Sequence, residues 1–389
     1  MTNILNHINT YADLTAYNND KEKDYPNVSY LVATDEVKWN KYDPDHIVAV
    51  YDVTSTSEAT KLLLSTTNIS KMWIDSVEQP SVVDSYTFDT LGEHIVKIGL
   101  SNKTTSRGCS FRFCNNIISA IIPSNVSLVY SYCFAQCENF ASIIIQNGVT
   151  YIDNNAFYLD TKLTNVTIPK SLTRIGNEAF SGCRGLTNIE IPSGVTNIGD
   201  GAFGGCTGLT NITIPDTVTS ISNGAFGGCT GLTSIVVDSA NTVFDSRNNC
   251  NAIIKTSTNE LIQGCNNTVI PNTVTSIGGD AFSSCHKLTS ITIPNNITNI
   301  GSWAFSNCTG LTSVTIPDSV TSIGVSAFNG CYKLTSVTIE AVTPPTLSSS
   351  NAFSNTNNCP IYVPAESLEA YKAATNWSSL ASRIKPISE

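Results

Sequence analysis

The chain has 389 residues, 41% hydrophobic and 13% charged, with 31 acidic and 21 basic side chains and a net charge of −10. An acidic chain does not present the basic surface that follows a phosphate backbone, so we expect no nucleic-acid partner. No apolar run reaches the roughly 18 residues that a membrane span needs. The length indicates either several domains or one repeat array.

Residues 1–27 predict a short amphipathic helix, because Ile4, Ile8, Tyr11 and Leu14 recur at helical spacing. The same stretch lacks the basic region and apolar segment of a secretory signal, so no signal peptide is visible. We expect an N-terminal helical segment here.

Residues 28–105 predict short strands with alternating polarity, such as HIVAVYDV. The run SYTFDTLGEHIVKIGL (85–100) resembles the closing hairpin of bacterial immunoglobulin-like modules, with Tyr86 and Phe88 facing the second strand across Gly92. This resemblance implies an immunoglobulin-like β-domain, a small β-sandwich, over this region.

A 23-residue period governs most of the remaining chain. It is carried by the repeat phenylalanines Phe111, Phe134, Phe157, Phe180, Phe203, Phe226, Phe282, Phe305 and Phe328. The same 23-residue step separates the leucines that open the L-T-x-[IV]-x-[IV] segments. It also separates the prolines that follow these segments. A single unit cannot bury its own apolar face but stacked units can, so the period predicts a solenoid.

Each unit is expected to contain two extended pieces. In L-T-S-V-T-I (311–316) the alternation of polarity predicts a half-buried strand. Pro317 has no N–H to donate and ends this strand. Val320 and Ile323 then turn a second extended piece back onto the core, and Phe328 fills the interior.

The full pattern, L-x-x-I-x-I-P-x-x-V-x-x-I-G-x-x-A-F-x-x-C, resembles the BspA-type leucine-rich repeat from about residue 111 to residue 340. The resemblance implies a mostly β fold, a right-handed leucine-rich-repeat solenoid over 106–358. It also implies adhesion or protein binding at a bacterial or protist surface, or secretion, and no reaction. The irregular stretch 245–271 resembles the long repeat of this family, with Ala252–Thr256 and Glu260–Gly264 as a hairpin.

The last core layer of a solenoid needs a cap. Residues 359–389 offer Leu368, Tyr371, Trp377 and Leu380 at helical spacing, so we expect a C-terminal helical cap.

Thirteen cysteines are present. Those in one slot of the repeat are Cys114, Cys137, Cys183, Cys206, Cys229, Cys285, Cys308 and Cys331. Stacking sets neighbours about 5 Å apart, but their side chains run parallel, whereas a disulfide needs converging Cβ vectors. We therefore predict buried thiols, and the pairs Cys250–Cys265 and Cys109–Cys133 stay open.

We predict no catalytic, cofactor or metal site, and no enzyme. The four histidines, His7, His46, His94 and His286, are scattered. No Ser, Thr or Cys has a visible base partner. The glycines of G-D-G-A-F-G (199–204) match a dinucleotide fingerprint only formally, because the next unit repeats them and no long helix follows.

Two surfaces are candidates for binding. The outward columns of the first strand display small neutral groups, namely Asn188, Asn211, Ser234, Ser290, Thr292, Ser313, Thr315 and Ser336. The long unit adds charge on a hairpin expected to project, with Asp245, Arg247, Lys255 and Glu260. The alternative for the columns is that they are β-forming residues exposed to water with no binding role. The alternative for the long unit is that it is a spacer that changes the curvature of the array.

The predicted function is a non-enzymatic binding or adhesion module that presents its repeat surface to a protein or glycan on a host or neighbouring cell. The alternative is a structural component of a larger assembly, an appendage or virion part joined through the N-terminal helix. Ice or crystal binding by the threonine column is a third idea, which Glu190 and Val236 interrupt. The sequence predicts no oligomeric state.

Overall fold

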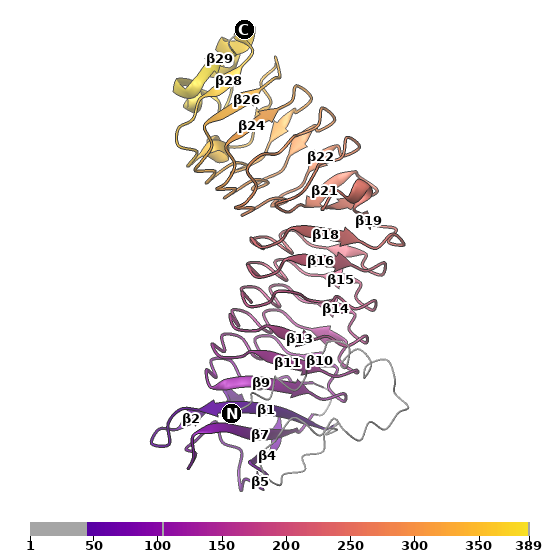
Figure 1. Ribbon diagram of the computed structural model, residues 1–389, viewed down its shortest axis with the longest axis vertical. Coiled ribbons are helices and arrows are strands. Elements are labelled where there is room, and N and C mark those ends of the chain that lie inside the picture. Colours follow the sequence, from indigo (N-terminus) through magenta and orange to yellow (C-terminus); the bar gives the residue numbers. More distant parts are fainter. Residues whose placement is uncertain (1–44, 103–104, 388–389) are drawn as a thin grey trace.

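The structure is a computed structural model that describes residues 45–102 and 105–387. The predicted helical segment at 1–27 lies outside the described residues. Stacked short strands form an elongated rod (Figure 1), and the fold class is confirmed as a mostly β leucine-rich-repeat solenoid with turns of about 23 residues.

The first sheet joins the residues before the repeats to the solenoid itself. Its strands, in spatial order, are β13 (Asn165–Thr167), β11 (Ser142–Ile145), β9 (Ile117–Ile122), β1 (His46–Val53), β7 (Gly92–Leu100), β4 (Ile69–Ile74) and β5 (Val77–Glu78). The repeat strands β9, β11 and β13 pair in parallel, whereas β1 pairs antiparallel with both β9 and β7. Strand β1 therefore covers the edge that the first repeat would otherwise expose.

The prediction of a hairpin at 85–100 is wrong. Strand β6 (Ser85–Tyr86) pairs with β2 (Thr60–Lys61), and β3 (Ser65–Thr66) pairs with β8 (Cys109–Ser110). Both edges of β7 are already occupied, by β1 and β4, so β6 has no free edge to join there. The immunoglobulin-like resemblance that rested partly on this hairpin stays a prediction.

The repeat strands stack in register one unit apart. The sheet of second strands is β10 (Leu128–Val129), β12 (Tyr151–Ile152), β14 (Arg174–Ile175), β15 (Asn197–Ile198) and β17 (Ser220–Ile221). The first-strand pair β16 (Asn211–Ile214) and β18 (Ser234–Val237) runs beside it, with Asn211 opposite Ser234. Equivalent residues of successive units are thus neighbours in space, as the period predicts.

The repeat phenylalanines form the centre of the core. Phe203 is fully buried, and its ring stacks on those of Phe180 and Phe226 at centroid distances of 5.5 and 5.3 Å. The slot cysteines close the turn beside them: the Cys206 thiol donates to the carbonyl of Phe180, one unit earlier, at 3.2 Å. The same bond recurs at Cys137, Cys183, Cys229, Cys308 and Cys331. The cysteine slot is therefore a packing and hydrogen-bonding position.

The long unit divides the rod. Strands β19 (Phe244–Asp245), β20 (Ile253–Lys255) and β21 (Glu260–Gln263) pair antiparallel, with η2 (Arg247–Asn249) between the first two. Strand β21 then starts a parallel ladder with β22 (Ser276–Ile277), β23 (Asn299–Ile300), β25 (Ser322–Ile323) and β27 (Thr346–Leu347). The buried apolar residues form two clusters that meet here, and the rod changes direction at β19–β21 (Figure 1).

The hairpin predicted in this unit is confirmed as β20–β21, but the expectation that it projects is wrong. Ile253, Ile254 and Leu261 are fully buried, so both strands belong to the core. Gly264 follows the hairpin, and a Cβ there would lie only 2.2 Å from the ring of Phe282. The long unit thus packs directly on the first ring of the second phenylalanine stack and starts a new core.

The C-terminal segment covers the last ring of that stack. The final sheet is β24 (Ser313–Ile316), β26 (Ser336–Ile339), β28 (Ile361–Val363) and β29 (Ile384–Pro386), and its helices are η3 (Ser350–Phe353), η4 (Ala365–Ser367), α2 (Leu368–Ala373) and η5 (Ser378–Arg383). Trp377 packs 5.9 Å from Phe353, and its Nε1 donates to Pro345 O. The predicted cap contains only one turn and a half of α-helix, because the chain returns to the sheet at β29.

Candidate functional site

The strand columns face solvent as predicted. Asn188, Asn211, Ser290, Thr292, Ser313 and Thr315 are exposed, and Ser234 and Ser336 are half-buried. The residues between them, such as Ile212 and Val314, are buried. Asn211 lies opposite Ser234, Ser313 opposite Ser336 and Thr315 opposite Thr338, so column residues of these neighbouring units lie side by side. They form a smooth strip of hydroxyl and amide groups without a charged or aromatic anchor among these eight residues.

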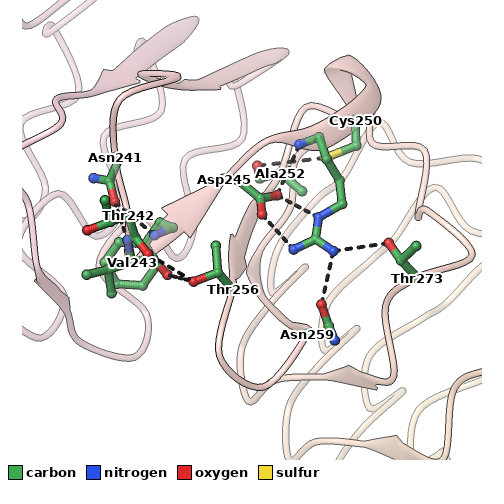
Figure 2. A network of polar contacts seen from close by, with 11 residues as sticks. Asn241, Thr242, Val243, Asp245, Cys250, Ala252, Thr256, Asn259 and Thr273 are labelled. Carbon is green, nitrogen blue, oxygen red and sulfur yellow. Dashed lines mark hydrogen bonds and ion pairs between the residues drawn. The ribbon is translucent and has the colours of Figure 1, made fainter.

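Asp245 and Arg247, two of the charged candidates in the long unit, are bound to each other. Arg247 Nε and Nη2 donate to the two oxygens of Asp245 at 2.8 and 2.6 Å, while Nη1 donates to Asn259 and Thr273 (Figure 2). The guanidinium therefore ties the β19 turn to the β20–β21 loop and to the following repeat. This bidentate geometry uses up both side chains in holding the long unit together.

Lys255 and Glu260, the other two candidates, lie opposite each other on β20 and β21. Both line a hollow of about 180 Å³, which we call the junction hollow. Its remaining walls come from Thr219, Ser220, Ile221, Asn223, Phe244, Ile262, Gly278 and Gly279. Strand β17 is the last strand of its sheet, so the hollow lies where one ladder ends and the next begins.

The chemistry of the junction hollow is polar and mixed in charge. Lys255 is exposed and Glu260 half-buried. Hydroxyl and amide side chains surround them, and the buried ring of Phe244 forms part of the wall. Such a site can hold a polar ligand by hydrogen bonds, with a cation and an anion available at its rim.

The thiols lie in the interior of the protein. All thirteen cysteines are free and buried, including both pairs that the sequence left open. Cys133 donates to Cys109 O and Cys265 to Asn251 O, in place of a disulfide. Burial raises the pKa of Cys206 to about 12, so this thiol stays protonated and is a poor nucleophile at neutral pH. Within 45–102 and 105–387, no group of three or more His, Cys, Asp or Glu is arranged to hold a metal ion.

Sequence analysis missed one polar group, because its members are far apart in the chain. His94 Nδ1 lies 2.6 Å from Asp75 Oδ2, and its Nε2 lies 3.0 Å from Thr90 O and 3.2 Å from Thr90 Oγ1. The order carboxylate, imidazole, hydroxyl matches a catalytic triad. However, both oxygens that Nε2 contacts belong to Thr90, four residues before His94, so the imidazole bridges Asp75 to the Thr90 turn. The group is an internal clamp, and the ring of Phe88 packs against His94 at a tilt, with 4.2 Å between the ring centres.

The other histidines have separate surroundings. His46 packs edge-on against Trp73, and exposed His286 bonds through Nδ1 to Asn307 O. His7 lies outside the described residues. Within the part of the chain that the structure describes, no helix combines the length and apolar character that a membrane crossing needs.

Comparison with known proteins supports the interpretation of the repeats as BspA-type leucine-rich repeats. The family model described as BspA type leucine rich repeat region matches residues 64–184, 150–262 and 254–379. A comparison with curated proteins finds no match.

Solved structures of bacterial repeat proteins are also similar. A leucine-rich repeat protein from Eubacterium ventriosum is 25% identical, with a TM-score of 0.56 over 64% of this chain and 66% of that one, just under two thirds of its length. A leucine rich cell surface protein from Faecalibacterium prausnitzii is 26% identical over 69% of this chain and 84% of its own, with a TM-score of 0.49. Because the family model covers well over half of the residues, this chain belongs to the BspA-type leucine-rich-repeat family.

Proposed function

We propose that this chain is a non-enzymatic binding module at a cell surface, and that a protein or glycan partner engages it at the junction hollow. The observation that carries the proposal is the interruption of the second-strand ladder between β17 and β21, where a polar hollow is lined by Lys255 and Glu260. Membership of a family of repeat proteins supports a binding role, since repeat solenoids use extended surfaces for recognition.

The position of the junction hollow makes it a better candidate for recognition than the strand columns are. The hollow lies between two groups of stacked units, each with its own buried core, so we expect the backbone around it to change little when a ligand binds. A preformed site loses little conformational entropy on binding. Lys255 and Glu260 also form no ion pair with any described residue, in contrast to Asp245 and Arg247.

Binding of the purified chain to an array of glycans and extracellular-matrix proteins tests this proposal. We expect a retained ligand to be lost with the double variant Lys255→Ala/Glu260→Gln, since it removes both charges but no buried contact. The matched control is Ser313→Ala/Thr315→Ala on the strand columns, which should leave binding unchanged.

A second variant tests the whole long unit, with residues 238–260 replaced by a regular unit and folding checked by circular dichroism. If Ser313→Ala/Thr315→Ala loses binding, while the Lys255→Ala/Glu260→Gln variant and the variant with 238–260 replaced both keep it, the binding site lies on the strand columns. Absence of any ligand for the unmodified chain would contradict the binding function itself.

A further inference from the structure

Each turn that follows a repeat phenylalanine contains a residue with left-handed backbone, two positions after the ring. We call it the post-phenylalanine position. From Gly182 onward it is filled by glycine, serine or asparagine: Gly182, Gly205, Gly228, Ser284, Asn307, Gly330 and Asn355 all have positive φ. In the first three units it is filled by Phe113, Gln136 and Leu159 instead. Bulky residues rarely adopt this conformation, so their presence needs a reason.

Packing explains Leu159 but not Phe113. The Leu159 side chain is half-buried and lies against Gly182 of the next unit, where an added Cβ would be 2.5 Å from Leu159 Cδ2. Phe113 has φ 63° and remains 43% exposed. Tyr132, at another turn position, has φ 57° and is 39% exposed. In the equivalent place other units mostly have residues that suit the left-handed backbone, such as Asn155 and Gly201, although Glu178 and exposed Trp303 also occur there.

The two exposed rings hold one guanidinium group. Arg112 Cζ lies 4.6 Å from the ring centre of Phe113 and 4.7 Å from that of Tyr132, and Nη2 donates to Gln136 Oε1 at 2.9 Å. Among the described residues no carboxylate lies within ion-pair distance of this arginine, and its buried Nε has no hydrogen-bond partner. The cation is therefore fixed in place while Nη1 stays available.

We propose that Arg112, Phe113, Tyr132 and Gln136 form a docking site for an acidic segment of a protein partner, in which an Asp or Glu side chain is flanked by apolar residues. The guanidinium edge suits a carboxylate, because its N–H groups form a planar fork. The exposed rings suit apolar neighbours, and Tyr, Arg and other large side chains are the residue types that dominate protein interfaces. Strained backbone that displays side chains without a packing role is typical of functional sites.

A protein segment fits this site better than an acidic glycan. The site offers one charged donor and one amide between two aromatic rings, whereas a sugar ring presents several hydroxyl groups that each need a partner. A second arginine–tyrosine contact, Arg107 with Tyr130 at 5.6 Å, adds positive charge two residues from Tyr132. This docking site goes beyond the proposed function at the junction hollow, and no residue is shared between the two.

The test uses a random-peptide library displayed on phage, selected on the full chain and counter-selected on Phe113→Gly. We expect recovered peptides to carry Asp or Glu next to apolar residues. One such peptide, synthesised with a fluorophore, should bind at least about ten-fold more weakly to Arg112→Gln and to Phe113→Gly, since each removes a desolvated contact. Lys255→Ala/Glu260→Gln should bind it normally, so this site and the junction hollow can fail independently.

The variants Phe113→Gly and Tyr132→Asn also separate recognition from folding, because other units use these residue types at the same positions. We expect their melting temperatures to be unchanged or raised, since the strained backbone is relieved. A clear drop in melting temperature would mean that the rings are structural and would overturn the proposal. Recovery of no Phe113-dependent acidic peptide, or displacement of the peptide by hyaluronan oligosaccharides, would overturn it as well.

Discussion

Asp160 should make the stability of this protein depend on pH. It occupies the repeat slot that cysteine fills in other units, and it is fully buried. Its Oδ1 accepts from Cys137 N at 2.8 Å, but its Oδ2 has no partner. Burial raises the pKa of Asp160 well above its ordinary value, with the Cys137 amide opposing that effect. The carboxyl group therefore stays neutral in the folded chain at pH values where it ionises in the unfolded chain.

The sign of the effect on stability follows from this raised pKa. The neutral carboxyl contributes its full stability below the unfolded pKa of about 3.9, and this contribution is lost as pH rises toward the folded pKa. Each pH unit inside that window lowers the free energy of unfolding by about 1.4 kcal/mol.

The variant Asp160→Asn isolates this contribution, because it keeps the shape and the acceptor for Cys137 N–H but cannot ionise. We expect the difference in unfolding free energy between Asp160→Asn and the unmodified chain to grow with pH in urea titrations followed by circular dichroism. Asp160→Cys, which restores the repeat pattern, should behave in the same way. Exposed Asp216→Asn controls for the loss of one negative charge. Stability curves that stay parallel from pH 5 to pH 7 would refute the reasoning.

Three further predictions concern the core. Phe203→Ala should lower the free energy of unfolding by about 3–5 kcal/mol, the usual range for a buried aromatic ring; exposed Thr213→Ala should change it by less than about 0.5 kcal/mol in the same urea titration. A thiol reagent without reductant should label few of the thirteen cysteines in the native chain and nearly all in denaturant; several disulfides in mass spectrometry would contradict this. Trp377→Ala should expose the ring of Phe353 and speed amide hydrogen exchange in the last units more than in the first, whereas a uniform effect along the rod would argue against a capping role.

The parts of the fold that repeat could be predicted from the sequence. Each slot is sampled many times, so the buried phenylalanine, the outward columns and the thiol position each follow from consistent periodicity. The β20–β21 hairpin was also predictable, because local alternation and turn residues define it. In all these cases the information is local or recurs at a fixed step.

The features that occur once and join segments distant in the chain could not be predicted. The pairing of β1 with β9, the Asp75–His94 contact and the bonds from Arg247 to Asn259 each join segments that no period connects. Charge alone placed Asp245, Arg247, Lys255 and Glu260 in one candidate group. The structure separates them, because the first two neutralise each other while the last two line the junction hollow.

A regular solenoid separates its core from its recognition chemistry, and this explains where variation is tolerated. A change at the phenylalanine or cysteine slot disturbs the stacking of two neighbouring units, and Asp160 is the departure in the cysteine slot whose cost is worked out above. The post-phenylalanine position lies at the surface and needs only a left-handed backbone. A residue such as Phe113 can therefore occupy it at the cost of local strain, about 1–3 kcal/mol, without altering the core. If the proposed docking site is correct, a partner distinguishes places along this rod at repeat units that depart from the pattern at such positions, rather than at the strand columns.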